Sequence, residues 1–354
     1  VAFGVDLRCE AAAHKRHPQG CFRLIRTAAH RDLHRNGSSS APLASPQIHI
    51  IIPSMLRSTS KEGKARMPEP GWYKGSLHAH TTESDGDESP ERVIEWFRDH
   101  GYDWLVLSDH NLRTVVDAGG GGASDRPLVI PGEEVTVQIE GQEKAVYVNA
   151  VGISTVVEPI DAREVLATIQ ANVNSVLRAG GIASLTAPYF RPGFDHEFVK
   201  EVDGPKLMEV YNAHPLNVLG DPNTFSYEGI WDAVLATGKV VYGTATDDSH
   251  HYLDFSPDKS NPGRAWVMTR AEELSEEAIV NSLSSGHFYA STGVSLKDLD
   301  ASPGGVSVEI EPADDHTYRT TFIGRGGAVF GEHVGLRASY RISGDEGYVR
   351  ARIA

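Results

Sequence analysis

Beyond residue 70, compact apolar runs alternate with amphipathic stretches along the chain. The stretches at 89–100, 161–179, 227–237 and 275–285 have helical spacing, and each is closed by a glycine. Ser89 followed by Pro90 marks a helix start, because serine caps the first turn and proline fits its first position. Helices are therefore predicted over these four ranges. Strands are predicted over 73–78, 102–108, 128–137, 145–153, 182–186, 206–212, 240–246, 265–269 and 288–291.

The alternation of strands and helices predicts an α/β fold with a parallel sheet or a barrel over residues 69–294. Past residue 295 the pattern changes to short strands without helices, at 306–311, 318–323, 337–342 and 348–353. We expect residues 295–354 to form a small antiparallel β appendage that is cut short at Ala354.

Residues 1–68 form a third region, rich in arginine and histidine and without periodicity. Residues 1–66 hold 11 Lys/Arg against 4 Asp/Glu, a surplus of +7, so the other 288 residues carry −22 of the net charge of −15. We predict a disordered basic leader over 1–68. The acidic remainder argues against binding to nucleic acid or to anionic membranes.

Several protein classes are excluded by what the sequence lacks. No apolar run approaches the roughly 18 residues that span a bilayer, and the early apolar stretch at 48–53 is too short for an export signal, so a cytoplasmic location is expected. Both cysteines, Cys9 and Cys21, lie in the leader, which excludes a disulfide framework or a thiolate site in the body. The glycines at 119–122 are not followed by the residues of a phosphate-binding loop.

Candidate metal ligands gather in four segments that each follow an apolar run. His78 and His80 lie at i and i+2 and face the same side of a strand, as do Asp248 and His250. The loop after His80 can return Asp85 to the same place. The remaining candidates are His110, which follows Asp109, and Glu134 on the third strand. Imidazoles and carboxylates without thiolates suit Zn, Mn or Fe in an open hydrolytic site.

These segments, in this order, resemble the PHP (polymerase and histidinol phosphatase) family over about residues 71–293. The stretches 261–266 and 288–293 are also similar to it. The resemblance implies a distorted (β/α)7 barrel that hydrolyses phosphoesters with up to three metal ions. It places Glu134, rather than Glu133, at the family's bridging glutamate. It places the other ligands at His78, His80, Asp85, His110, Asp248 and His250.

Two departures from the family concern one of the three ions. Ala187 stands before Pro188 where the family usually has histidine, and the strand at 145–149 offers Tyr147 and Asn149 instead of a histidine. We therefore expect two divalent ions (Zn, Mn or Fe) rather than three.

The leading hypothesis is hydrolysis of a phosphoester bond in a small phosphorylated metabolite or nucleotide by metal-activated hydroxide. Asp248 is assigned to proton handling or to pure ligation. His214 replaces a lost metal ligand, donates a proton to the leaving group or is structural. Arg264 binds phosphate or forms a surface ion pair, and Asn212 is a further candidate for substrate binding.

Two alternatives stay open from the sequence. The departures at Ala187, Tyr147 and Asn149 are also typical of a metal-binding regulatory module that has lost turnover. The same ligands also suit a metal hydrolase of a non-phosphate bond such as an amide. No nucleic-acid scaffold or membrane partner is expected, and the sequence does not fix the oligomeric state.

Overall fold

The computed structural model describes the backbone of 48–52 and residues 70–116, 127–142, 145–186, 196–215, 226–302, 304–313 and 315–354. Apart from 48–52 and residue 70, the residues before 71 lie outside the described part of the chain. Ala187 and the glycines at 119–122 also lie outside it. None of the described helices is long and apolar enough to cross a membrane.

The first ligand-bearing strands pair in parallel. β2 (Gly71–Ser76) lies beside β3 (Trp104–Val106), which lies beside β4 (Leu128–Ile130). Between β2 and β3 runs α1 (Pro90–Asp99), in which Ser89 accepts a hydrogen bond from the Arg92 backbone N–H. The predicted start of this helix is thus confirmed.

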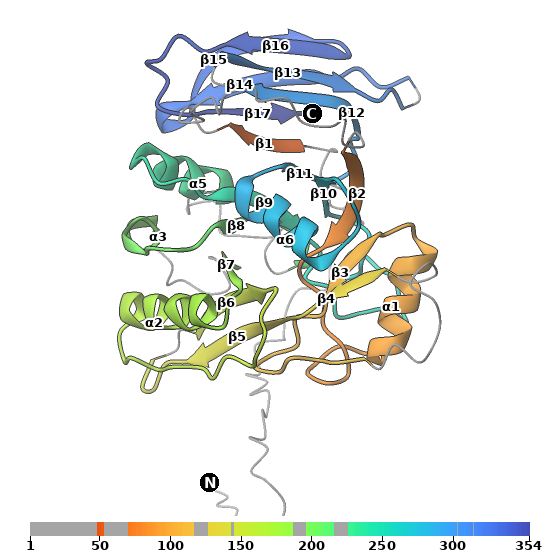
Figure 1. The fold of residues 1–354 in the computed structure, drawn as a ribbon, viewed down its shortest axis with the longest axis vertical. Helices are drawn as coiled ribbons and strands as arrows, with labels where there is room; N and C mark the ends of the chain where they lie inside the picture. Colours follow the sequence, from red (N-terminus) through yellow and green to blue (C-terminus); the bar gives the residue numbers. More distant parts are fainter. Residues whose placement is uncertain are drawn as a thin grey trace, which may run out of the picture. The chain divides into compact units, whose positions relative to one another are not determined.

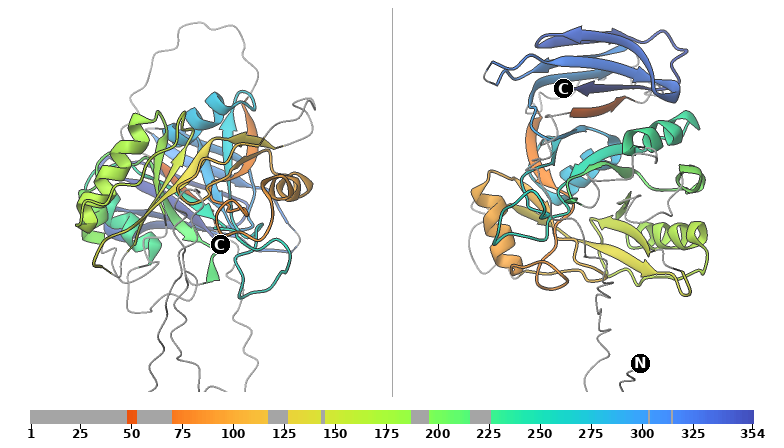
Figure 2. Two further views of the ribbon diagram at one scale, coloured as in Figure 1. Left: turned by 90° about the horizontal axis from the view of Figure 1, so that it is seen from below. Right: turned by 180° about the vertical axis from the view of Figure 1, so that it is seen from behind.

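A second sheet carries the later ligands. Its strands are β5 (Gly132–Gln138), β6 (Ala145–Val151), β7 (Ile182–Leu185), β8 (Leu207–Asn212) and β9 (Tyr242–Thr246). The pairs β5–β6 and β6–β7 are antiparallel, whereas β7–β8 and β8–β9 are parallel. Three helices lie along one side of this sheet (Figures 1 and 2): α2 (Val165–Arg178), α3 (His196–Glu201) and α5 (Tyr227–Ala236).

The predicted closed barrel is not seen as one continuous sheet. The two sheets are linked through isolated parallel bridges, which join Ala79 to Ser249 and His110 to Glu134. The strand predicted over 128–137 is two strands, because Pro131 lies between β4 and β5 and has no N–H to donate to a ladder. The observed architecture is therefore an α/β fold of separate, bridged sheets, whose core includes the buried Trp104, Ile130 and Trp231.

The C-terminal strands are antiparallel, as predicted, but they are more numerous than the four expected. They follow β10 (Trp266–Ala271), α6 (Glu276–Ser285) and β11 (Phe288–Ser291). Within the described residues they are β12 (Leu296–Ser302), β13 (Gly305–Ile310), β14 (Arg319–Gly324), β15 (Ala328–Val334), β16 (Arg337–Arg341) and β17 (Val349–Ile353). The strands β12 and β15 were not predicted, because their exposed positions give them no clear apolar alternation.

One segment corrects the predicted disordered leader. Ile48–Ile52 forms strand β1, which pairs antiparallel with both β17 and β11 (Figure 1). Its sequence, Ile-His-Ile-Ile-Ile, is rich in the β-branched residues that favour strands. Through β1, the C-terminal strands β14, β15 and β17 join the same sheet as β11, β10 and β2.

Candidate metal centre

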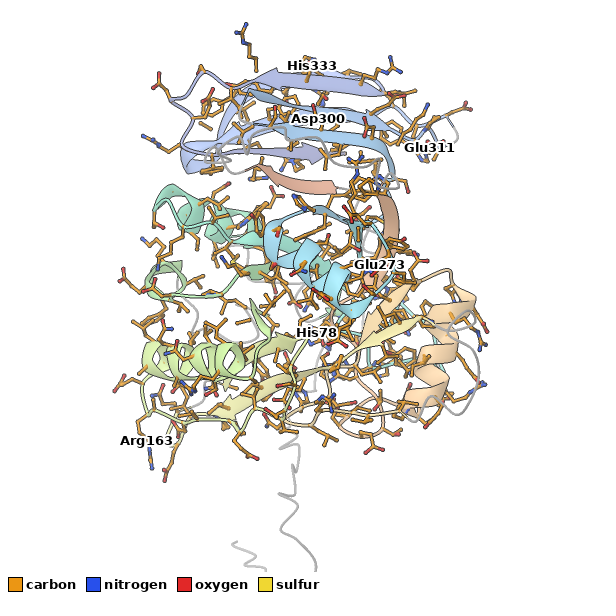
Figure 3. All side chains as sticks on the ribbon, in the orientation of Figure 1. His78, Arg163, Glu273, Asp300, Glu311 and His333 are labelled. Atoms are coloured by element: carbon orange, nitrogen blue, oxygen red, sulfur yellow. The ribbon has the colours of Figure 1, made fainter. Side chains whose placement is uncertain are left out.

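Two histidines lie at the start of the site, directly after β2. The side chains of His78 and His80 are both fully buried, and their Nε2 atoms are 3.0 Å apart. The i, i+2 spacing predicted that they share a side, and the structure confirms it. Figure 3 labels His78 among the strands of the interior.

Among the residues that the structure describes, two groups of side chains have the geometry of a metal site. The first, which we call the outer cluster, consists of His80, Asp85, His110 and His250; the second, the inner cluster, consists of His78, His80 and Asp248. Within each group the candidate ligand atoms lie within 4.8 Å of one another. His80 belongs to both.

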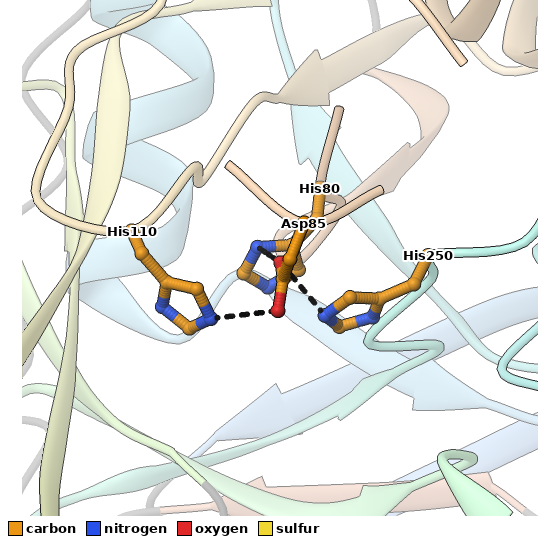
Figure 4. A group of neighbouring side chains, drawn as sticks. All are labelled: His80, Asp85, His110 and His250. Carbon is orange, nitrogen blue, oxygen red and sulfur yellow. Dashed lines mark ion pairs between the residues drawn. The ribbon is translucent and has the colours of Figure 1, made fainter. Parts of the chain in front are cut away.

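In the outer cluster, Asp85 lies between three imidazoles (Figure 4). Its carboxylate is 3.5 Å from His80 Nδ1, 3.5 Å from His110 Nε2 and 3.3 Å from His250 Nε2. The side chain of Asp85 is 55% exposed and that of His110 is 28% exposed, so the cluster is open to solvent on this side.

In the inner cluster, Asp248 Oδ1 is 3.2 Å from His78 Nε2 and 3.4 Å from His80 Nε2. Glu134 lies against both clusters: Oε1 is 3.4 Å from His78 Nε2, and Oε2 is 3.6 Å from His80 Nε2 and 3.0 Å from His110 Nδ1. One carboxylate thus faces both groups, which is the placement that a bridging ligand requires.

Most of these separations are compatible with a metal ion held between the side chains. Zn–N bonds of about 2.0–2.1 Å place neighbouring donors of a tetrahedral ion about 3.4 Å apart. The contacts of Asp85 and those of Asp248 with the two imidazole Nε2 atoms lie between 3.2 and 3.5 Å, whereas most N–H···O hydrogen bonds are about 2.7–3.2 Å. The donor set of imidazole nitrogens and carboxylate oxygens is also one that Zn, Mn and Fe accept.

The pKa values of the two buried histidines, His78 and His80, are shifted in opposite directions. Burial alone would lower the pKa of His78, but the Asp248 and Glu134 carboxylates raise it well above its usual value. Burial together with the charge of His250 lowers the pKa of His80 to about 4. The pKa shifts of these two adjacent imidazoles thus have opposite signs.

The carboxylates of the site are held in the ionised form. Burial favours the neutral acids, but neighbouring imidazoles lower the pKa values of Asp85, Glu134 and Asp248 below their usual range. At His110, burial lowers the pKa, but the Asp85 and Glu134 carboxylates outweigh it and raise the pKa to about 10. In the absence of a metal ion these carboxylates and imidazoles pair with one another, and a divalent cation would take the place of the imidazole protons.

Asp109, the neighbour of His110, fixes the loop that carries Asp85. Its carboxylate is fully buried and accepts hydrogen bonds from Thr81 N (2.8 Å), Thr81 Oγ1 (2.8 Å) and Ser84 Oγ (2.6 Å). The loop turns tightly at Gly86, where an added Cβ would lie 2.6 Å from the His80 carbonyl oxygen. Asp109 therefore orients the site and is not one of its ligands.

Two residues beside the site have left-handed backbone. Asp248 has φ of 51° and Asn111 has φ of 53°, a conformation that costs a non-glycine residue about 1–3 kcal/mol. The Asn111 side chain compensates by bonding to the backbone of Thr136, accepting from its N–H at 2.7 Å and donating to its C=O at 2.9 Å.

Of the other predicted site residues, Asn212 and His214 lie beside members of the clusters, whereas the Arg264 contacts are within its own loop. Asn212 Nδ2 donates to Asp248 Oδ2 at 3.2 Å, and the His214 ring lies 5.7 Å from that of His250. Burial lowers the pKa of His214, which favours its neutral form. Arg264 Nη2 donates to Ser256 O and Asn261 Oδ1 within its own loop. Its role in phosphate binding stays a prediction.

Strand β6, where Tyr147 and Asn149 stand in place of the histidine that is usual in the PHP family, also faces the site. Asn149 on β6 is directly opposite Glu134 on β5, so the two side chains share a face of the sheet. Asn149 is 1% exposed, and within the described part of the chain its Oδ1 has no hydrogen-bond partner. The ring of Tyr147 lies 6.4 Å from that of His110.

One buried acid beside the site was missed from the sequence. Glu209 on β8 lies 2.7 Å from His78 Nδ1 and is 1% exposed. A lone glutamate in the otherwise buried run of β8 was the available sign of a polar function.

Comparison with known proteins finds similarity only at the level of solved structures. No protein-family model and no curated protein matches the chain. A two-domain protein from Bacteroides vulgatus containing a predicted PHP-like metal-dependent phosphoesterase is 16% identical, with a TM-score of 0.47, over 83% of this chain and 91% of that one.

Two further structures are similar over about half of this chain. A candidate metal-dependent phosphoesterase from Bifidobacterium adolescentis is 16% identical over 55% of this chain and 91% of that one, with a TM-score of 0.37. An amidohydrolase from Chromobacterium violaceum, with bound sulfate and no metal, is 15% identical over 53% and 93%, with a TM-score of 0.37. The functional conclusion below rests on the side chains of the site and not on these similarities.

Proposed function

We propose that this protein is a metal-dependent phosphoesterase acting on a small phosphorylated metabolite or nucleotide. The observation that carries the proposal is the pair of clusters that share His80, with donor atoms spaced as around a metal ion. In this proposal two divalent ions are held by His78, His80, Asp85, His110, Glu134, Asp248 and His250. When bound, such ions supply positive charge for phosphoryl oxygens and acidify water at neutral pH.

The chain's own groups provide access, orientation and proton handling. The exposed Asp85 carboxylate and the partly exposed His110 ring mark the side from which a substrate reaches the site. His78 and Asp248, both buried, keep the far side closed to bulk water. Asn212 holds Asp248 through its amide, and we assign proton handling to Asp248 and to His214.

The proposal is tested by hydrolysis of a generic aryl phosphate in the presence of Zn, Mn or Fe, with and without chelator. We expect chelation to abolish turnover, and His80→Ala to lower kcat/KM by at least about 100-fold, because loss of a shared ligand disturbs both clusters. His100→Ala is the matched control, since His100 is exposed and stacks on Trp96 outside the site.

Two results would overturn the assignment. Bound metal without turnover across a broad panel of phosphoesters favours the regulatory module. Turnover of amides but not of phosphoesters favours a hydrolase of another bond.

A further inference from the structure

Glu209 is a buried carboxylate that belongs to neither cluster. It lies on β8, is 1% exposed, and accepts hydrogen bonds from Thr246 Oγ1 at 2.7 Å and from Asn212 Nδ2 at 2.9 Å. Its Oε1 is also 2.7 Å from His78 Nδ1. A buried carboxylate is costly unless it is hydrogen-bonded, and here both oxygens have partners.

The contact with His78 determines which ring nitrogen faces the clusters. At 2.7 Å the two atoms are within hydrogen-bond distance, and a carboxylate oxygen can accept from an imidazole Nδ1–H. The opposite nitrogen, Nε2, then faces Asp248 Oδ1 at 3.2 Å and Glu134 Oε1 at 3.4 Å. A metal ligand whose other ring nitrogen donates to a carboxylate has a fixed tautomer, a fixed orientation and greater basicity.

The backbone of β8 is adapted to bring Glu209 into this position. Side chains three apart on a regular strand point to opposite faces. Glu209 and Asn212 nevertheless bond to each other, because the register of β8 against β9 shifts between Glu209 and Tyr211. Such irregularities re-aim side chains beside active sites.

We propose that Glu209 is a positioning residue that holds His78 with its proton on Nδ1 and aims Nε2 at the metal. This inference rests on the proposed metal-dependent function. It requires that Glu209 acts through His78 and is not itself a ligand.

The test uses the full chain loaded with zinc, which is diamagnetic. The two measurements are the zinc affinity, from competition with a chelator, and the ¹⁵N and ¹H resonances of the His78 ring. Glu209→Ala is expected to weaken zinc binding by about 10–100-fold and to remove the hydrogen-bonded Nδ1–H resonance of His78. In Glu209→Gln the amide oxygen still accepts from Nδ1–H, so that resonance is expected to persist.

Thr246→Val is the matched control. It removes another hydrogen bond to the same Glu209 oxygen without touching His78, and zinc affinity is expected to stay near the wild-type value. If Glu209→Ala does not fold, Glu209→Gln decides the question: zinc bound through His78 Nδ1 in that variant contradicts the proposal.

Two further results would overturn the role of Glu209. One is wild-type zinc affinity in Glu209→Ala with an unchanged His78 ring. The other is loss of a full equivalent of zinc at saturation, which makes Glu209 a ligand. Both differ from failure of the proposed function itself, in which the wild-type protein binds no zinc or binds it without hydrolysing phosphoesters.

Discussion

Asp109 shows how a single buried acid can organise a site without binding anything in it. Its oxygens collect hydrogen bonds from Thr81, Ser84 and Thr114 and so hold the loop that presents Asp85. Glu209 has the equivalent role behind His78. Both acids lie next to predicted ligands in space, but neither occupies a ligand position.

We predict that Asp109→Ala destabilises the protein by about 2–4 kcal/mol, because several buried donors lose their acceptor. The variant should also lose metal, since the loop with Asp85 is no longer held. Urea unfolding and metal content measure the two effects. Asp99→Ala, at an exposed acid, is the control. Unchanged stability in Asp109→Ala would show that the loop does not depend on this carboxylate.

At the residue scale, the sequence predicted which side chains would meet, but it did not predict the buried acid Glu209 that contacts one of them. The i, i+2 spacing of His78 and His80 is a local pattern, and the structure confirms that their side chains meet. Glu209 is 131 residues from His78, so their contact depends on the pairing of distant strands. Arg264 Nη2 donates to Ser256 O and Asn261 Oδ1 in its own loop, and its predicted contact with phosphate is not tested by these bonds.

At the scale of elements, the four helices predicted from the sequence are present, whereas the short α3 and the strands β1, β12 and β15 were missed. The Ser89 cap and the left-handed Gly286 that ends α6 are both read directly from the sequence. Strands need partners, and the partners of β1 come from the far end of the chain, which is why Ile48–Ile52 was assigned to the leader. The strands β12 and β15 were missed for another reason, because most of their residues are exposed and show no apolar alternation.

The turn between β16 and β17 carries a pH-dependent contribution to stability. Glu346 accepts hydrogen bonds from Ser343 Oγ and N, at 2.6 and 2.7 Å, and from Gly344 N at 2.8 Å. The Ser343 hydrogen bonds lower the pKa of Glu346 from 4.5 to about 2. A pKa lowered by folding stabilises the protein above the unfolded value, and this stabilisation is lost as pH falls toward the folded value.

We therefore expect Glu346→Gln to be less stable than wild type at neutral pH, with a difference that shrinks as pH falls from 4.5 toward 2. Thermal unfolding of both proteins across this window measures the difference. A difference that does not change with pH would exclude ionised Glu346 as its source.

At the scale of the whole molecule, the C-terminal strands are more firmly attached than an appendage requires. β1 places them in one sheet with β11, β10 and β2. A buried ionic cluster adds to this: Arg350 on β17 donates to both oxygens of Asp232 on α5, at 2.8 and 2.9 Å, and Tyr348 donates to the same carboxylate at 2.7 Å. Since these residues are more than 110 positions apart, no local pattern predicts them.

Removing one partner of a buried ion pair leaves the other charge uncompensated, so Asp232→Ala is expected to cost about 3–5 kcal/mol. Glu228→Gln is the control, because Glu228 is the more exposed partner of Arg350 and its loss should cost less. Chemical denaturation measures both variants. Equal stability of the wild type and Asp232→Ala would contradict the role of this cluster in joining α5 to β17.

The central claim is that imidazoles and carboxylates from distant strands converge to hold divalent ions around His80. Elemental analysis of the purified wild-type protein and of His80→Ala tests it most directly. We predict about two equivalents of divalent metal in the wild type and loss of both in the variant, because His80 belongs to both clusters. A wild-type protein without bound metal, or an undiminished metal content in His80→Ala, would contradict the claim.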